Sequence, residues 1–116
     1  GRWALPGGWA DVGYSPGEIA VKEVRGEAGL EVRADRLLGV LDKKHHPHPL
    51  HLYYTYKIFI ACEILGGSMQ GGLETSEVAF FSPDELPELS VGRNTESQIL
   101  AMYARAITPS MPAMFD

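Results

Sequence analysis

The order of predicted elements favours an α/β sandwich, in which helices pack against a sheet. Residues 16–28 have the caps and the apolar spacing of a helix, and residues 95–106 repeat that pattern. Between them, residues 52–65 are rich in Tyr, Ile and Phe and apolar on both faces, which predicts a strand. Extended segments are also predicted over residues 31–42 and 75–81.

The first helix has a start and a stop signal in the sequence. Ser15 is placed as the N-cap, Pro16 at the first helical position and Glu18 at the third, which together make a capping box. Gly29 is placed to end the helix in a left-handed cap. The helix should pack through an apolar stripe at helical spacing, made of Ala20, Val21, Val24 and Ala28.

Two carboxylates, Glu23 and Glu27, lie one helical turn apart beside that stripe. Like charges at this spacing destabilise a helix by roughly 0.2–0.5 kcal/mol, and a bridging cation reverses the sign. The glycine-rich loop that leads into the helix, with Gly7 and Gly8, brings backbone close to a ligand. Because oxygen ligands suit Mg²⁺ or Mn²⁺, the sequence favours a metal site for a phosphate. A solvated helix face is the alternative.

The remaining segments are connections in this interpretation. Residues 43–51 form a loop broken by two prolines, and residues 66–72 form a flexible glycine-rich loop. Residues 82–85 open a short helical turn, and residues 108–116 are predicted as an irregular tail. In the second helix, Thr95 and Gln98 form the capping box, and the residues expected to face inward are Ile99, Leu100, Tyr103 and Ile107.

Composition narrows the class of protein. The 116 residues suffice for one domain, with 45% hydrophobic and 22% charged residues. A net charge of −5 argues against general nucleic-acid binding, which needs a basic face. No apolar run approaches the ~20 residues of a membrane span, and no signal peptide is visible. The single cysteine, Cys62, is expected to be a buried thiol and fits a cytoplasmic location.

Residues 8–30 resemble the signature of the Nudix hydrolases, G-x5-E-x7-R-E-U-x-E-E-x-G-U, where U is a bulky aliphatic residue. The resemblance implies a Nudix-fold α/β/α sandwich with a mixed sheet, covering residues 1–116 as one domain. Three positions depart from the signature. Tyr14 replaces an acidic residue, Lys22 replaces an arginine and so loses the bidentate fork, and Gly26 replaces a glutamate.

The resemblance also assigns roles to residues. It implies that Glu23 and Glu27 hold Mg²⁺ or Mn²⁺, together with the backbone carbonyl of Gly7. Lys22 would orient the glutamates of the signature. In the family an acidic residue before a later strand often serves as a further metal ligand or general base. Glu74 and Glu77 both stand at this place, Glu77 is favoured, and plain loop charge is the alternative for either. The water's proton would then go to Glu23 or Glu77.

Residues 38–49, 56–64 and 74–87 resemble one bacterial subgroup, which acts on nucleoside diphosphate derivatives such as CDP-choline and ADP-ribose. The implied reaction splits such a substrate into a nucleoside monophosphate and phospho-X. The rival hypothesis is a degenerate Nudix domain that binds a nucleotide without cleaving it, and the departures at Tyr14 and Gly26 favour it.

Several residues are candidates for substrate contact. Trp9 and Tyr14 flank the glycine loop and are suited to stack on a base, with core packing as the alternative. Lys57 is a candidate for phosphate contact, with a solvated charge as the alternative. The histidine cluster in residues 45–51 fits no zinc spacing, so a surface loop is favoured over a metal site or substrate contact.

The start of the chain is short for this family. The resemblance implies one or two strands before the signature, and the bacterial subgroup usually carries a helical extension, for which residues 1–6 leave no room. Either the chain is a fragment of a longer protein, or the missing sheet edge is supplied otherwise. Because an uncovered strand edge invites pairing with another chain, a homodimer that covers it is a hypothesis.

Overall fold

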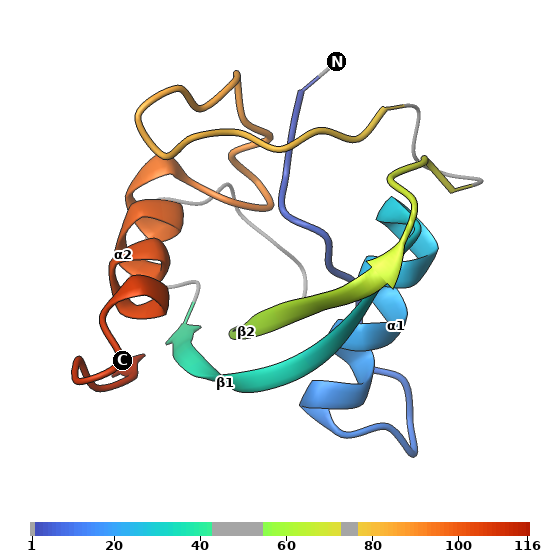
Figure 1. Cartoon of the computed structure of the whole chain (residues 1–116). Helices are drawn as coiled ribbons and strands as arrows, with labels where there is room; N and C mark the ends of the chain where they lie inside the picture. The colour runs from blue at the N-terminus through green and yellow to red at the C-terminus, as the bar shows by residue number, and fades with distance from the viewer. Residues whose placement is uncertain (1, 43–54, 73–76) are drawn as a thin grey trace. The chain divides into compact units, whose positions relative to one another are not determined.

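The structure is a computed structural model that describes residues 2–42, 55–72 and 77–116. Its elements, in chain order, are α1 (Pro16–Ala28), β1 (Leu30–Asp42), β2 (Tyr56–Gly67), α2 (Glu96–Ile107) and β3 (Met114–Phe115) (Figure 1). The strands form one sheet in the order β2-β1-β3.

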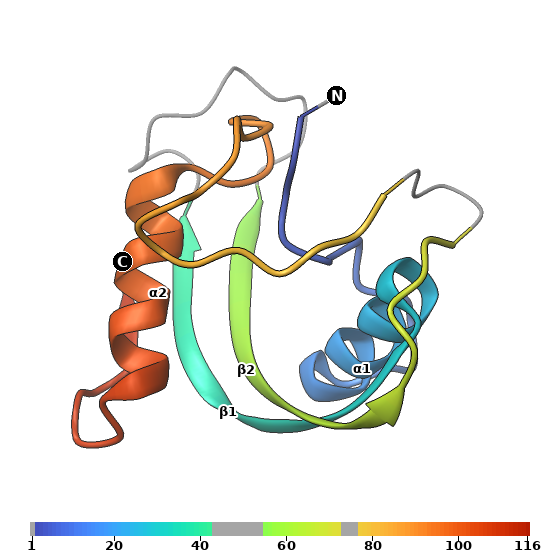
Figure 2. The same cartoon turned by 45° about the horizontal axis from the view of Figure 1, so that its top comes forward.

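The sheet is mixed, as expected. β1 and β3 are parallel, with Gly39 opposite Met114 and Val40 opposite Phe115. The arrowheads of β1 and β2 point in opposite directions in both views (Figures 1 and 2). No helix in the described part of the chain is both long and apolar enough to cross a membrane.

The chain divides into two compact units, each built from separate segments. The first, here called the α1 unit, comprises Pro6–Arg36 and Ile60–Phe80. The second, the α2 unit, comprises Gly1–Leu5, Leu37–Phe59 and Phe81–Asp116. Each long strand contributes one part to each unit. A single domain over residues 1–116 stays a prediction.

The caps of α1 are those that the sequence predicts. Ser15 Oγ accepts the Glu18 N–H at 3.2 Å, and the Glu18 carboxylate accepts the Ser15 N–H at 2.9 Å. The bond from the Ser15 N–H, followed by the interaction of the carboxylate with the Ser15 hydroxyl, lowers the pKa of Glu18. Gly29 has φ 73° and ends the helix. The predicted stripe is right in part, because Ala28 is buried but the other fully buried residue is Ile19.

The end of β2 and the glycine-rich segment that follows it pack tightly on the C-terminal end of α1. Gln70 N–H donates to Ala28 O at 3.0 Å. A Cβ on Gly67 would lie 2.5 Å from Gly29 O, and one on Gly72 would lie 2.0 Å from Gly26 O. The predicted loop over residues 66–72 is therefore wrong at its start, which belongs to β2, and the glycines serve close backbone contact.

The α2 unit has its core between β1 and α2. Leu38, Leu41, Phe59 and Met102 are buried there. A Cβ on Gly39 would lie 2.6 Å from Met102 Cε, so the helix side chain fills the space that this glycine leaves. The tail prediction is wrong where it includes β3, whose pairing with β1 continues in a 3.2 Å bond from Asp116 N–H to Val40 O.

The inward face of α2 differs from the predicted one. Its buried residues are Gln98 and Met102, whereas Leu100, Tyr103 and Ile107 are 39%, 42% and 61% exposed. Polar groups near the N-terminus of the helix take part in this buried face. Gln98 is used inward because its side chain accepts from Thr95 N–H in the capping box, and the buried Asn94 accepts the Leu5 N–H.

The predicted strand over residues 75–81 is wrong in its described part, since residues 77–81 form no strand. Trp3 instead makes a parallel bridge with Leu89, and its ring meets Phe81 edge-on at 4.8 Å. The Val-Ala-Phe-Phe run has strand propensity, but such propensity depends on a partner strand. Residues 82–85 form the expected turn, closed by a bond from Glu85 N–H to Ser82 O.

β2 begins at Tyr56 in the described part of the chain and is less buried than its sequence indicates. Residues 52–54, like the histidine cluster at 45–51, lie outside the described residues. Phe59 is buried, but Tyr56, Ile58 and Ile64 are exposed. Cys62 is half-buried rather than buried, and desolvation raises the pKa of its thiol.

Two alanine substitutions in α1 test the cap. Gly29→Ala should lower the free energy of unfolding by more than about 1 kcal/mol, because residue 29 is left-handed and a Cβ would meet Ser68 O at 2.4 Å. Gly26→Ala is the matched control and should raise stability by about 0.5–1 kcal/mol, since its Cβ meets nothing within 4 Å. Urea unfolding measures both, and equal effects would contradict this description.

Candidate functional site

The backbone of the loop before α1 binds one of the two carboxylates, that of Glu27. Within the α1 unit, Gly7 N–H donates to Glu27 Oε2 at 2.9 Å. Glu23 and Glu27 are both half-buried on the regular helix α1, one turn apart, as the sequence predicts. The loop backbone and the carboxylate pair therefore form one local structure.

Gly8 brings the same loop against the other carboxylate, that of Glu23. A Cβ on Gly8 would lie 2.8 Å from Glu23 Cδ and Oε1 and 2.9 Å from Oε2. Only a residue without a side chain permits the Glu23 carboxylate to rest on the loop in this way. The two consecutive glycines thus serve the two glutamates, Gly7 through its N–H and Gly8 through its missing side chain.

This arrangement offers two carboxylates to a cation. Mg²⁺ usually keeps several waters and is bound by one or two carboxylates plus substrate phosphates, so the pair fits such an ion. Within residues 2–42, 55–72 and 77–116, no three His, Cys, Asp or Glu side chains gather into a metal-binding group. Glu77, which is exposed, does not join the pair in such a group, and its predicted role stays a prediction.

Lys22 contacts the loop rather than a glutamate of the signature. Its Nζ lies 2.5 Å from Asp11 Oδ2 and 5.0 Å from the centre of the Tyr14 ring. The bond with Asp11 and the charge of Asp11 raise the pKa of Lys22, with smaller contributions from Tyr14 and Glu23. Sequence reasoning missed Asp11. The signal available was an acidic residue in the same loop in which Tyr14 replaces the family's acid.

The three candidates for substrate contact lie on the loop before α1 and on β2. Trp9 is 64% exposed and Tyr14 is 49% exposed, so neither ring is a core residue. Lys57 is half-buried on β2 in the α2 unit. Its predicted contact with phosphate stays a prediction, as does stacking of a base on Trp9 or Tyr14.

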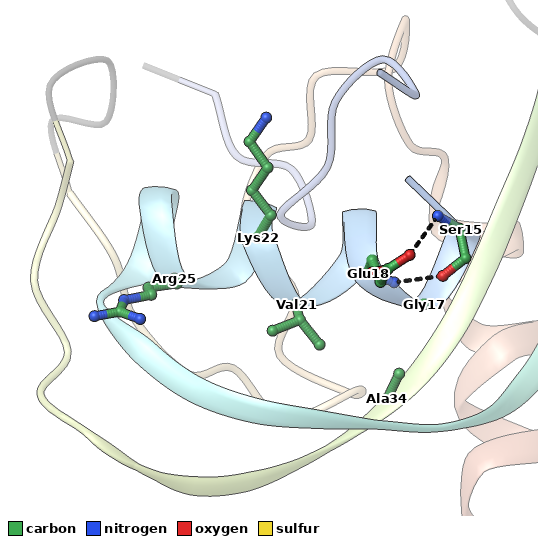
Figure 3. A pocket seen from close by; sticks show the side chains of 7 residues that line it. All are labelled: Ser15, Gly17, Glu18, Val21, Lys22, Arg25 and Ala34. Carbon is green, nitrogen blue, oxygen red and sulfur yellow. Dashed lines mark hydrogen bonds between the residues drawn. The ribbon is translucent and has the colours of Figure 1, made fainter. Parts of the chain in front are cut away.

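An open pocket of about 600 Å³ lies between α1 and the first part of β1. Figure 3 shows Val21 and Arg25 pointing toward β1 and Lys22 pointing away from it. The pocket is lined by Ser15, Gly17, Glu18, Val21, Lys22, Arg25 and Ala34. Because neither Glu23 nor Glu27 lines it, this pocket is separate from the carboxylate site.

The contact between Gly8 and Glu23 gives a test. Gly8→Ala should push the Glu23 carboxylate aside, while the free energy of unfolding changes by less than about 1 kcal/mol because only the end of a flexible side chain must move. A crystal structure of the variant and urea unfolding measure the two effects. A Glu23 carboxylate that stays in place would contradict the contact.

Three comparisons with known proteins indicate the family of the chain. Residues 1–103 match the NUDIX domain family. The chain is 45% identical over 114 residues to YjhB of Bacillus subtilis (strain 168), a protein provisionally named as an ADP-ribose pyrophosphatase. The match covers 98% of this chain and 55% of that protein.

Solved structures extend the agreement to the fold. An ADP-ribose pyrophosphatase from Streptococcus suis is 41% identical with a TM-score of 0.89, over 100% of this chain and 83% of that one. A UDP-X diphosphatase is 35% identical with a TM-score of 0.87, and the match covers 99% of this chain and 55% of that one. The chain spans about half the length of the curated relatives it matches. With its signature loop, capped helix and mixed sheet, the chain belongs to the Nudix family and has the Nudix fold.

Proposed function

We propose that this chain contributes the catalytic domain of a divalent-metal-dependent hydrolase, which cleaves the diphosphate of a nucleoside diphosphate linked to another moiety. The products would be a nucleoside monophosphate and phospho-X. The observation that carries the proposal is the pair Glu23 and Glu27, held against the backbone of Gly7 and Gly8. The relatives named as ADP-ribose pyrophosphatases favour ADP-ribose within this substrate class, with CDP-choline as a second member.

The proposed metal is Mg²⁺ or Mn²⁺, held by Glu23 and Glu27 with the carbonyl of Gly7. When bound, such a metal offsets the negative charge of the diphosphate and lowers the pKa of a bound water. The chain supports this role by fixing Glu27 through the Gly7 N–H, so that less rotamer freedom is lost when a cation binds.

Other steps fall to residues of the chain. A carboxylate, Glu23 or Glu77, would take the proton of the attacking water. Trp9 and Tyr14, both exposed on the loop, are suited to stack on the base. Lys57 is the proposed phosphate contact, because an ammonium attracts a phosphate oxygen.

A matched pair of variants tests the metal site. Glu27→Gln keeps an oxygen that accepts the Gly7 N–H but removes the charge that a cation needs. We expect the fold to persist and the Mg²⁺-dependent turnover of ADP-ribose to fall roughly 100-fold or more. Glu63→Gln, which removes an exposed carboxylate paired with Arg33, should turn over normally. Retained turnover in Glu27→Gln would refute the assignment.

The second candidate function is nucleotide binding without hydrolysis, which the glycine at position 26 favours. A side chain fits there, since a Cβ on Gly26 meets nothing within 4 Å. Gly26→Glu therefore restores the glutamate of the family signature without a clash.

Turnover of ADP-ribose by the wild type and by Gly26→Glu separates the two functions. Our proposal expects the wild type to be active already. A wild type that binds nucleotide but gains turnover only as Gly26→Glu would instead show a degenerate domain that this glycine disabled.

A further inference from the structure

The loop and α1 share a second set of contacts, made by Lys22 of the helix. We propose that Asp11 and Tyr14 are positioning residues, which act through Lys22 to hold the glycine loop against Glu23 and Glu27. This inference rests on the proposed function, because it concerns the carboxylates assigned there to the metal. Asp11, Tyr14 and Lys22 are called the loop clamp below.

The loop clamp closes the far end of the loop on the helix. Lys22 Nζ contacts Asp11 Oδ2 at 2.5 Å and lies 5.0 Å from the Tyr14 ring centre, within the range of a cation–π contact. Tyr14 N–H donates to Asp11 O at 3.3 Å and so forms the turn that presents both groups. Gly13, with φ 93°, lies within this turn.

Two side chains at this end of the loop are largely exposed. Val12 is 101% exposed and Trp9 is 64% exposed, so the segment buries little apolar surface. Segments with few buried contacts open easily unless polar contacts fix them. The near end is fixed by Gly7 on Glu27 and by Gly8 on Glu23. The loop clamp is therefore the contact that keeps the intervening residues from pulling the near end away.

The physical consequence is local rather than global. Both members of the ion pair are 50% exposed, and exposed ion pairs add little to global stability. Loss of the loop clamp should leave the melting temperature nearly unchanged. It should raise the freedom of residues 9–13, and with it the cost of ordering Glu23 and Glu27 around a cation.

The test compares Asp11→Asn with the wild type by two measurements that need no turnover. We expect amide hydrogen exchange over residues 9–13 to quicken, and the dissociation constant for Mn²⁺, followed by electron paramagnetic resonance, to rise about 10-fold. In a Lys22→Met background, Asp11→Asn should have no further effect, because the contact is already lost.

Matched variants make the result specific. Tyr14→Phe keeps the ring and should match the wild type in loop exchange and Mn²⁺ binding, whereas Tyr14→Leu should resemble Asp11→Asn in both measurements. Glu63→Gln removes an exposed ion pair of the same unit on the sheet and should change neither measurement. Unchanged loop exchange in Asp11→Asn, or an equal effect of Asp11→Asn in both backgrounds, would overturn the loop clamp.

Turnover of ADP-ribose by the wild type judges the proposed function separately. A wild type that hydrolyses ADP-ribose, with unchanged exchange and Mn²⁺ binding in Asp11→Asn, refutes the loop clamp alone. An inactive wild type whose loop exchange still quickens in Asp11→Asn refutes the proposed function and leaves the contact between loop and helix standing.

Discussion

The contact between the loop backbone and the two glutamates is the constraint on which the site depends. Gly7 N–H fixes Glu27, and Gly8 admits the Glu23 carboxylate onto the loop. Without this contact the two like charges would repel one another and spread into solvent. With it they are held half-buried on one side of α1, as a cation site requires.

Close backbone packing continues at the C-terminal cap of α1, next to Glu27. Gly29 ends the helix with φ 73°. Gly67, the last residue of β2, lies against Gly29, and Gly72 in the following segment lies against Gly26 of α1. Glycine contacts therefore line the C-terminal half of α1, from Glu23 to the cap at Gly29.

Local signals predicted α1, its caps and the placement of Glu23 and Glu27 on it, whereas pairings between distant segments could not be predicted from the sequence. The caps of α1 and α2 and the spacing of Glu23 and Glu27 are encoded within a few residues of each other. The buried face of α2 could not be predicted, because it depends on Gly39 and on the segment that binds Asn94. Asp11 was missed because its partner lies on another element.

The most direct test of the account is product analysis of ADP-ribose incubated with the wild-type chain, with and without Mg²⁺ or Mn²⁺. Two carboxylates repel a diphosphate unless a cation lies between them. We therefore expect AMP and a ribose phosphate only when the metal is present. Intact ADP-ribose in the presence of either metal, together with a melting temperature that the nucleotide raises, would contradict it and indicate a domain that binds without cleaving.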